Sequence, residues 1–218
     1  MWCIGKIDAE YRKRMYDILD LYSEPYDSRK PVIGVDEKPK QLLGEKRKPI
    51  RMKPGSAERY DYEYIRNGSA NIFMGVDFKA GKRFTEVTDH RCKADFALFM
   101  KRLAAQYPRA TRLRIVLDNL NTHFEKSFLE TFGKKKAKKL LKRFEFHYTP
   151  KHASWLNAAE IEIGVMDTEC TGQRIPDKKT LMIEVRAWNA RRNRQRKKID
   201  WKFTRKDADR KLGKHYVT

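Results

Sequence analysis

Residues 111–123 read TRLRIVLDNLNTH, and this stretch decides the fold. Its run RIVL is short, apolar and rich in β-branched residues, which is typical of a buried strand, and the strand ends at Asp118. The stretch VIGVDE at residues 32–37 has the same form, so we expect a second buried strand with Asp36 at or near its exit. Since an unpaired buried charge is costly, two such strands in one sheet favour bringing both aspartates to the same edge.

The rest of the chain predicts an α/β fold, a mixed sheet flanked by helices. FEFHY at residues 144–148 indicates a third strand, and residues 71–89 read as a hairpin around the turn KAG, with Gly81 at positive φ. Residues 44–70 are polar and rich in Pro and Gly, so we expect mostly loop and edge structure there. Apolar spacing predicts helices over the ranges 8–22, 94–107, 124–143, 155–172 and 178–195, the fourth with Ser154 as its N-cap.

The chain is strongly basic, with 50 Lys and Arg against 29 Asp and Glu among 218 residues and a formal net charge of +21. This excess indicates a polyanionic partner, above all nucleic acid. Two basic tracts are candidate tracks for a DNA backbone, although such runs are more often simply solvated faces. They are Lys134, Lys135, Lys136, Lys138 and Lys139, and Arg191, Arg192, Arg194, Arg196, Lys197 and Lys198.

The cysteine content and the lengths of the apolar runs indicate the cellular compartment of the protein. The 3 cysteines are widely spaced, and the N-terminus lacks a signal-peptide core. No apolar run approaches the roughly 18 residues that span a membrane. We therefore expect a cytoplasmic protein with no membrane partner.

A third carboxylate, Glu160, opens the helix that follows the third strand. Carboxylates without a neighbouring His or Cys cluster suit Mg²⁺ or Mn²⁺ rather than zinc. Two such ions roughly 3.5–4 Å apart would activate a water and stabilise the leaving oxygen in phosphodiester cleavage. From the residues alone, however, a carboxylate at a strand end is more often a turn or capping residue.

Three sequence blocks sharpen this interpretation: VIGVDEKPKQ at 32–41, IVLDNLNTHF at 115–124 and HYTPKHASWLNAAEIEIGVM at 147–166. The second holds an Asp-Asn-x-x-x-His pattern at Asp118, Asn119 and His123. The third holds a Pro-x-x-x-Ser-x-Leu-Asn-x-x-Glu pattern that ends at Glu160. Together the blocks resemble the DDE transposases of the mariner superfamily, most closely its bacterial insertion-sequence branch, and the likeness runs over nearly the whole chain.

The resemblance implies a ribonuclease-H-like (retroviral-integrase-like) catalytic domain over residues 31–198, between an N-terminal helix and linker (1–30) and a C-terminal tail (199–218). It implies that Asp36, Asp118 and Glu160 are catalytic and hold two Mg²⁺ or Mn²⁺ ions. In that family water cleaves at the transposon ends, and the freed 3′ hydroxyl then attacks target DNA, usually at TA. Double-stranded DNA would be the partner, with a homodimer assembled on it, in a bacterial, nucleoid-associated protein.

Two departures from the family pattern leave the third carboxylate open. The spacing between Asp118 and Glu160 is longer than the family usually has, with the surplus in the lysine-rich stretch 134–143. Ala158 also stands where a proline commonly follows the motif's asparagine. Glu162 is therefore a rival ligand. Residues two apart on a helix point about 200° apart, so only one of the pair faces the metals. Motif spacing favours Glu160.

Four further residues have two interpretations each. Asn119 either contacts bound DNA or supports a metal ligand from behind. His123 either contacts bound DNA or orients the loop after the second strand. Asn157 either braces the helix of Glu160 or serves only its N-terminal structure. Trp155 either stacks on a base or anchors the same helix in the core.

Two other functions stay in play. A structure-directed nuclease or junction resolvase on the same fold is disfavoured by the two motif blocks. A domesticated, non-catalytic DNA-binding protein is disfavoured by the intact carboxylates. Family members usually carry N-terminal helix-turn-helix modules that recognise the transposon ends, and this chain begins where the catalytic domain would begin. We therefore expect the chain alone to cleave poorly and without sequence preference.

Overall fold

The computed structural model describes residues 6–120 and 125–217. In this part of the chain, five strands form one mixed sheet in the order β3-β2-β1-β4-β5. The pairs β1–β2 and β2–β3 are antiparallel, whereas β1–β4 and β4–β5 are parallel. The mixed sheet, its hairpin and the apolar strands are therefore as predicted. The strands are β1 (Val32–Glu45), β2 (Tyr64–Asp77), β3 (Lys82–Thr88), β4 (Leu113–Leu117) and β5 (Phe144–Tyr148).

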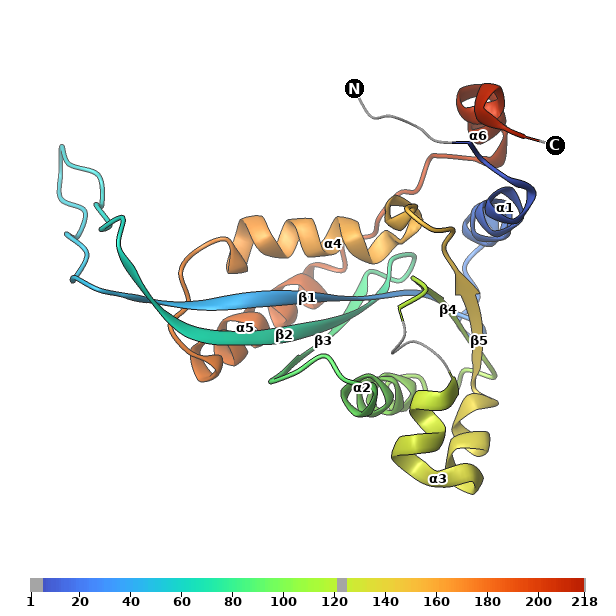
Figure 1. Ribbon diagram of the computed structural model, residues 1–218, viewed down its shortest axis with the longest axis horizontal. Coiled ribbons are helices and arrows are strands. Elements are labelled where there is room, and N and C mark those ends of the chain that lie inside the picture. Colours follow the sequence, from blue (N-terminus) through green and yellow to red (C-terminus); the bar gives the residue numbers. More distant parts are fainter. Residues whose placement is uncertain (1–5, 121–124, 218) are drawn as a thin grey trace.

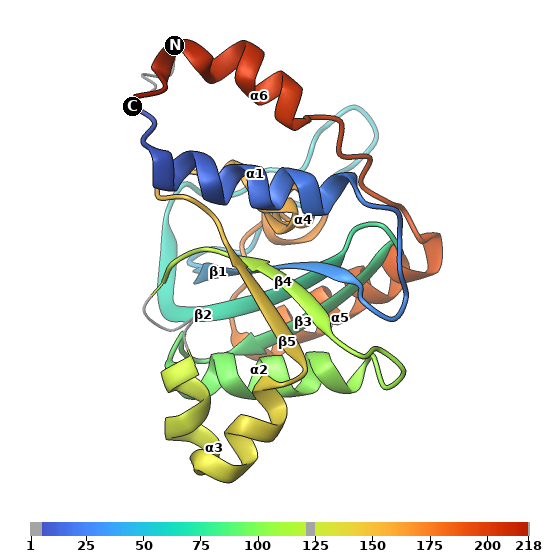
Figure 2. The same ribbon diagram turned by 90° about the vertical axis from the view of Figure 1, so that its right-hand side faces the viewer.

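Helices cover both faces of the sheet, with α1 and α4 on one face and α2 and α3 on the other (Figures 1 and 2). α5 packs beside β3 and adds to the layer of α4. Each face buries its own apolar core, so all five residues of β4 are buried, as expected for a strand covered on both sides. The helices are α1 (Ala9–Ser23), α2 (Lys93–Ala105), α3 (Glu125–Leu141), α4 (Ala158–Met166), α5 (Lys178–Gln195) and α6 (Arg205–Leu212).

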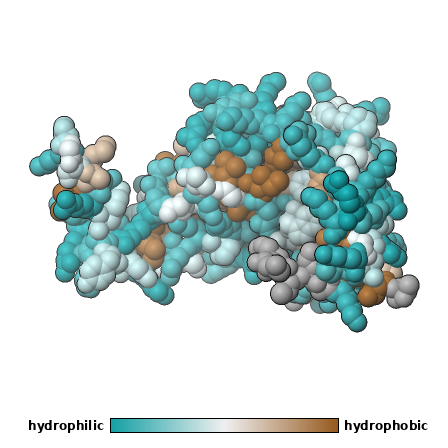
Figure 3. All heavy atoms as spheres, turned by 90° about the horizontal axis from the view of Figure 1, so that it is seen from above, coloured by the Kyte–Doolittle hydropathy of each residue, from teal (hydrophilic) through white to brown (hydrophobic). Residues whose placement is uncertain are grey.

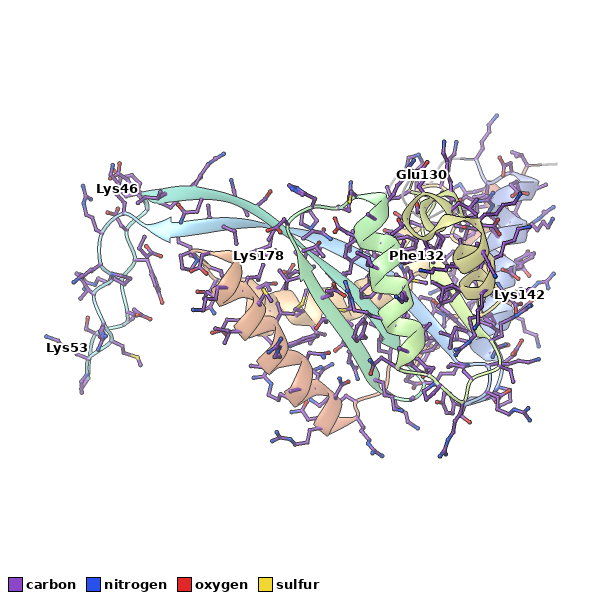
Figure 4. All side chains as sticks on the ribbon, turned by 90° about the horizontal axis from the view of Figure 1, so that it is seen from below. Lys46, Lys53, Glu130, Phe132, Lys142 and Lys178 are labelled. Carbon is purple, nitrogen blue, oxygen red and sulfur yellow. The ribbon has the colours of Figure 1, made fainter. Side chains whose placement is uncertain are left out.

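β1 and β2 continue past the sheet as a two-stranded arm, seen at the left of Figure 1. Their pairing runs on to Glu45↔Tyr64, and residues 46–63 form the tip, where Lys46 and Lys53 point outward (Figure 4). The loop and edge structure expected over 44–70 is thus loop at residues 46–63, and strand of the two-stranded arm at residues 44–45 and 64–70. Cross-strand pairing satisfies the backbone there, while the side chains of residues 64–69 are exposed and give no apolar alternation.

The helix expected over 155–172 is divided into three parts. Ser154–Leu156 form a 3₁₀ turn, α4 follows, and Asp167–Thr171 form a π-helical turn. The N-cap of α4 is Asn157 rather than Ser154, because the Asn157 side chain accepts a hydrogen bond from the Ala159 N–H at 3.1 Å. The α-helix therefore starts three residues later than predicted, at Ala158, two residues before Glu160.

Two other helices depart from the sequence pattern. α3 is broken at Gly133, whose φ of 73° lies in the left-handed region that glycine adopts without strain. Residues 199–218, expected as a tail, contain α6, which begins at a capping box between Thr204 and Asp207. α6 lies against α1 in Figure 2. None of the described helices is long and apolar enough to cross a membrane.

Candidate active site

Asp36 and Asp118 occupy matching positions on neighbouring parallel strands. The last pair between β1 and β4 is Gly34↔Val116, and each aspartate stands two residues beyond its member of that pair. Residues two apart in a strand share a face, so Asp36 lies on the face of Gly34, which contacts the start of α4. The register thus brings the two carboxylates to one place, as the sequence predicts.

Asp36 does not stand at the exit of its strand, contrary to expectation. β1 loses β4 as a neighbour after Gly34, yet it keeps β2, with Asp36 paired to Met74 and the pairing continuing into the arm. The strand therefore runs on for nine residues past Asp36, to Glu45. Only the parallel half of the pairing ends where the sequence pattern predicts an exit.

Asn157 joins the strand of Asp36 to the helix of Glu160. Its side-chain amide donates to the carbonyl of Val35 at 2.9 Å and to Oδ2 of Asp36 at 3.2 Å, while its Oδ1 caps α4. The residue is 1% exposed. A Cβ on Gly34 would stand 2.7 Å from Oδ1 of Asn157, so this close approach of strand and helix requires glycine. Of the two interpretations of Asn157, the bracing one agrees with these contacts.

Glu160 and Glu162 point in different directions from α4. Glu160 lies in the first turn and is exposed. Glu162 is 1% exposed and forms ion pairs with Arg83 of β3 at 2.9 Å and Arg192 of α5 at 2.8 Å. Burial alone would raise the pKa of Glu162, but the hydrogen bonds from both arginines hold it below the usual value. Glu162 is thus engaged in the layer between α4, α5 and β3, away from the two aspartates.

The three candidate carboxylates repel one another. Burial raises the pKa of Asp36 to about 7; a hydrogen bond from the Glu37 N–H opposes this, and the negative charges of Glu160, Glu37 and Asp118 add to it. Such mutual repulsion is what a bound cation would relieve, and an all-oxygen donor set suits Mg²⁺ or Mn²⁺. Within residues 6–120 and 125–217, however, no three His, Cys, Asp or Glu side chains close around a single ion position.

The loop after β4 is held by helix α1. Oδ1 of Asn119 accepts a hydrogen bond from Arg14 at 2.6 Å, and Nδ2 of Asn119 donates to the carbonyl of Thr149 at 2.5 Å. Asn119 therefore links the loop after β4 to α1 and to the carbonyl of Thr149, which follows β5. His123 lies outside the described residues.

Tyr22, also on α1, holds the other side of the site. Its hydroxyl donates to the carbonyl of Leu156 at 2.9 Å and accepts from the N–H of Ala158 at 3.2 Å. These two backbone groups flank Asn157, so the buried hydroxyl fixes the segment from which α4 begins. The sequence analysis identified neither Tyr22 nor Arg14, because both lie on a helix expected only to precede the domain.

The remaining candidates divide by exposure. Trp155 is 41% exposed and meets the ring of Phe203 edge to face, so it is not a buried core anchor. Lys134, Lys135 and Lys136 are exposed on α3, as are Arg191 and Arg194 on α5. Arg192 is 6% exposed and paired with Glu162, so it is not part of an open basic track. Arg191 and Arg194 lie on the exposed side of α5, whereas Arg192 lies on the buried side. The basic sequence alone does not show this difference.

The family and fold of the chain agree with this geometry. A family model described as DDE superfamily endonuclease matches residues 31–182, and no curated protein matches the chain. The chain is similar to the Mos1 transposase paired-end complex with left transposon end, with a TM-score of 0.56 and 14% identity, over 90% of this chain and 62% of that one. It is also similar to the Mos1 Strand Transfer Complex, with a TM-score of 0.57 and 15% identity, over 87% and 57%.

The chain thus spans less than two thirds of either solved structure. At such identity the likeness shows the fold, and the predicted ribonuclease-H-like class is confirmed. The family model covers more than half of the chain. The chain therefore belongs to the DDE superfamily endonuclease family.

Proposed function

We propose that the chain is the catalytic domain of a DDE transposase, which cleaves DNA at transposon ends and transfers the freed 3′ end into target DNA. The observation that carries this proposal is the shared register of Asp36 and Asp118 on the face covered by α4, with Glu160 in the first turn of that helix. The similar Mos1 structures, a paired-end complex and a strand transfer complex, support the reaction class.

Asp36, Asp118 and Glu160 would hold two divalent ions, Mg²⁺ or Mn²⁺. A Mos1 paired-end complex has been solved with each of these metals. Bound ions would lower the pKa of a water and stabilise charge on the leaving oxygen. The chain's own contribution is positional: Asn157 orients the carboxylate of Asp36 and the start of α4, and Tyr22 and Asn119 fix the backbone on either side.

Glu160 is the third carboxylate in this proposal. Its exposure leaves it available to a substrate, and its charge acts on Asp36. Glu162 is the poorer candidate, because freeing it would leave two arginines without their buried partner.

The finer features of the proposal concern partners. We infer that double-stranded DNA binds as transposon ends and as target, that TA is the target step, and that two copies assemble on DNA. The net charge of +21 supports a DNA partner. Figure 4 labels lysines in separate regions: Lys46 and Lys53 on the arm and Lys142 after α3 project outward, whereas Lys178 at the start of α5 pairs with Asp89.

The test is metal-dependent cleavage and joining on a labelled duplex that carries candidate transposon ends, with Mg²⁺ and with Mn²⁺. Asp36→Asn, Asp118→Asn and Glu160→Gln should each lower cleavage more than about a hundredfold, because each removes a proposed ligand. Each variant should keep its thermal midpoint within a few degrees, since the change relieves repulsion. Wild-type cleavage by any of the three would refute the assignment.

Glu162→Gln is the matched control on the same helix. It should lower the thermal midpoint, because it breaks a buried ion pair, while the folded fraction keeps cleaving. The opposite pattern, a stable but inactive Glu162→Gln beside an active Glu160→Gln, would reverse the choice of ligand. A product that is cut but never joined to target would favour a structure-directed nuclease instead.

A further inference from the structure

An open hollow of about 410 Å³ lies beside α4, between this helix and the segment that leads into α6. We call it the aromatic hollow. Its apolar walls are Trp155, Ile161, Trp201, Phe203 and Leu212. In Figure 3, hydrophobic residues gather in the middle of the upper face, where Figure 1 has α4. Soluble domains rarely leave a contiguous apolar surface without a use for it.

The aromatic walls are held rigidly. Trp155 meets Phe203 edge to face, with ring centroids 5.3 Å apart. The indole N–H of Trp201 donates to the carbonyl of Phe203 at 2.9 Å. In this perpendicular pair one ring contributes an edge and the other a face, and Trp155 keeps 41% of its surface exposed on a planar side chain.

The aromatic hollow adjoins the carboxylate site along the chain. Ile161, on its wall, directly follows Glu160 on α4, and Trp155 belongs to the 3₁₀ turn that leads into Asn157. The same backbone segment therefore carries both the proposed ligand and the aromatic wall. A strand bound at Glu160 would have to pass close to the hollow.

The rim of the hollow is charged for a phosphodiester backbone. Lys202 and Lys211 line it beside a single acidic residue, Asp200. Lys211 also lies over the ring of Phe203, 5.5 Å from its centroid. The surrounding segment 197–211 adds five further basic residues, Lys197, Lys198, Arg205, Lys206 and Arg210, against Asp207 and Asp209. Arg205 and Arg210 pair with Asp20 and Asp207, so the free positive charge comes from the lysines. An aromatic floor with a cationic rim is the combination that binds single-stranded nucleic acid.

We propose that the aromatic hollow binds an unpaired nucleobase of the DNA strand held at the carboxylate site, with the base stacked on Trp155 and the adjoining phosphate near Lys202 and Lys211. The proposal rests on the proposed DNA-cleaving function and adds a subsite to it. The volume lies within the ~300–1,000 Å³ that small ligands occupy. Stacking takes any base, so the hollow selects unpaired structure rather than sequence.

The test measures binding without metal, by fluorescence anisotropy in EDTA. The probes are a short single-stranded oligonucleotide and the same oligonucleotide with abasic sites. Trp155→Ala should weaken binding to the first about 5- to 100-fold, the range expected for the loss of one stacked base. It should leave binding to the abasic strand unchanged. Trp155→Phe, which keeps a stacking face, should restore most of the affinity.

Ile183→Ala is the matched control, because Ile183 is an exposed apolar residue on α5, away from the hollow. It should change neither affinity. If Trp155→Ala weakened binding to the intact and the abasic oligonucleotide equally, or to neither, the proposal would be overturned. The aromatic hollow would then be a candidate site for a protein partner.

A second readout uses 2-aminopurine as the unpaired base. Its fluorescence should be quenched by the wild-type protein and should stay unquenched with Trp155→Ala; equal quenching by both would also overturn the subsite. These measurements need no cleavage, so failure of base binding with active cleavage refutes only the hollow. Base-dependent binding without any metal-dependent cleavage refutes only the proposed function.

Discussion

Asn157 donates one side-chain amide to the carbonyl of Val35 and to the carboxylate of Asp36, at 2.9 and 3.2 Å. The same residue caps α4 through its Oδ1. One buried side chain therefore sets both the orientation of a carboxylate and the position of the helix that carries Glu160. These two roles are separable by mutation.

Asn157→Asp keeps an oxygen for the cap but loses the amide donor and brings a negative charge next to Asp36. We expect cleavage to fall about 10- to 100-fold, the usual cost of removing a group that orients a metal ligand, while DNA binding in EDTA stays unchanged. Asn157→Ala should show the same loss and, in addition, a drop of about 0.5–2 kcal/mol in unfolding free energy from the missing cap. Single-turnover cleavage and urea unfolding measure the two effects. A wild-type rate for Asn157→Asp would mean that the amide donor has no role.

Gly34→Ala should destabilise the protein and impair the site together. The new Cβ would meet Oδ1 of Asn157 at 2.7 Å and the N–H nitrogen of Ala159 at 2.9 Å, both shorter than real Cβ contacts. Forcing the strand and α4 apart should cost about 1–3 kcal/mol of unfolding free energy.

Gly164→Ala is the control for that substitution. Gly164 lies on α4 with nothing within 4 Å of the added Cβ, so alanine should stabilise the helix by about 0.5–1 kcal/mol and leave cleavage intact. Thermal denaturation of the two variants in parallel measures the difference, and equal midpoints would contradict the steric argument.

Arg192→Ala and Arg194→Ala should separate stability from DNA binding. Arg192 is buried against Glu162, and breaking such a pair costs about 3–5 kcal/mol, measured by urea unfolding. Arg194 is exposed, so its loss should change stability by less than about 0.5 kcal/mol. If α5 lies along a DNA backbone, Arg194→Ala should reduce the slope of log affinity against log salt by about 1. Similar effects of the two variants on unfolding would be inconsistent with the buried ion pair.

Asp77 should give folding a measurable pH dependence. The residue is fully buried at the end of β2, where its Oδ1 accepts the N–H of Ala80, and burial raises its pKa to about 6. The folded state therefore binds the proton more tightly than the unfolded chain, whose Asp titrates near 3.9. The stabilisation from this group is full below about pH 4 and is lost as pH rises through 6, on the order of 3 kcal/mol.

Asp77→Asn keeps an acceptor for Ala80 and removes the charge. Its unfolding free energy should match the wild type near pH 4 and exceed it at pH 7, as measured by urea titrations across this range. Asp200→Asn, on an exposed side chain, is the control for the substitution itself. A wild-type excess at pH 7 would show that the buried carboxylate is stabilised by its surroundings instead.

The sequence predicts the elements that have an apolar pattern. RIVL, FEFHY and the hairpin around Gly81 form strands as expected, because the apolar residues of each segment are enough to predict that it is buried. The proximity of Asp36 and Asp118 also follows, since parallel strands with matching apolar runs end at one edge of a sheet. The choice between Glu160 and Glu162 follows only from spacing, because helical phase alone does not say which side faces the sheet.

Other features depend on partners that are distant in the chain. The arm extends β2 by exposed residues such as Arg66, whose strand conformation comes from pairing with Leu43 rather than from its own hydropathy. In the sequence, Arg192 is one residue of a basic tract. Its burial depends on Glu162, which it shares with Arg83, and the sequence does not show this contact. Ser154 is as good a cap by type as Asn157, and only the contact with Gly34 and Asp36 selects the asparagine.

The bracing of the site by α1 means that the boundary of the family match is not the boundary of cooperative folding. The match begins at residue 31, but Met15 and Ile18 fill the core beneath α4, and Tyr22 supplies the partner of the Ala158 N–H. A fragment trimmed to the matched residues would expose that core. It would also remove the Tyr22 hydrogen bonds that hold the N-terminus of α4. Any fusion that uses this domain should therefore keep α1, and the fusion point should lie before Asp8, the N-cap of that helix.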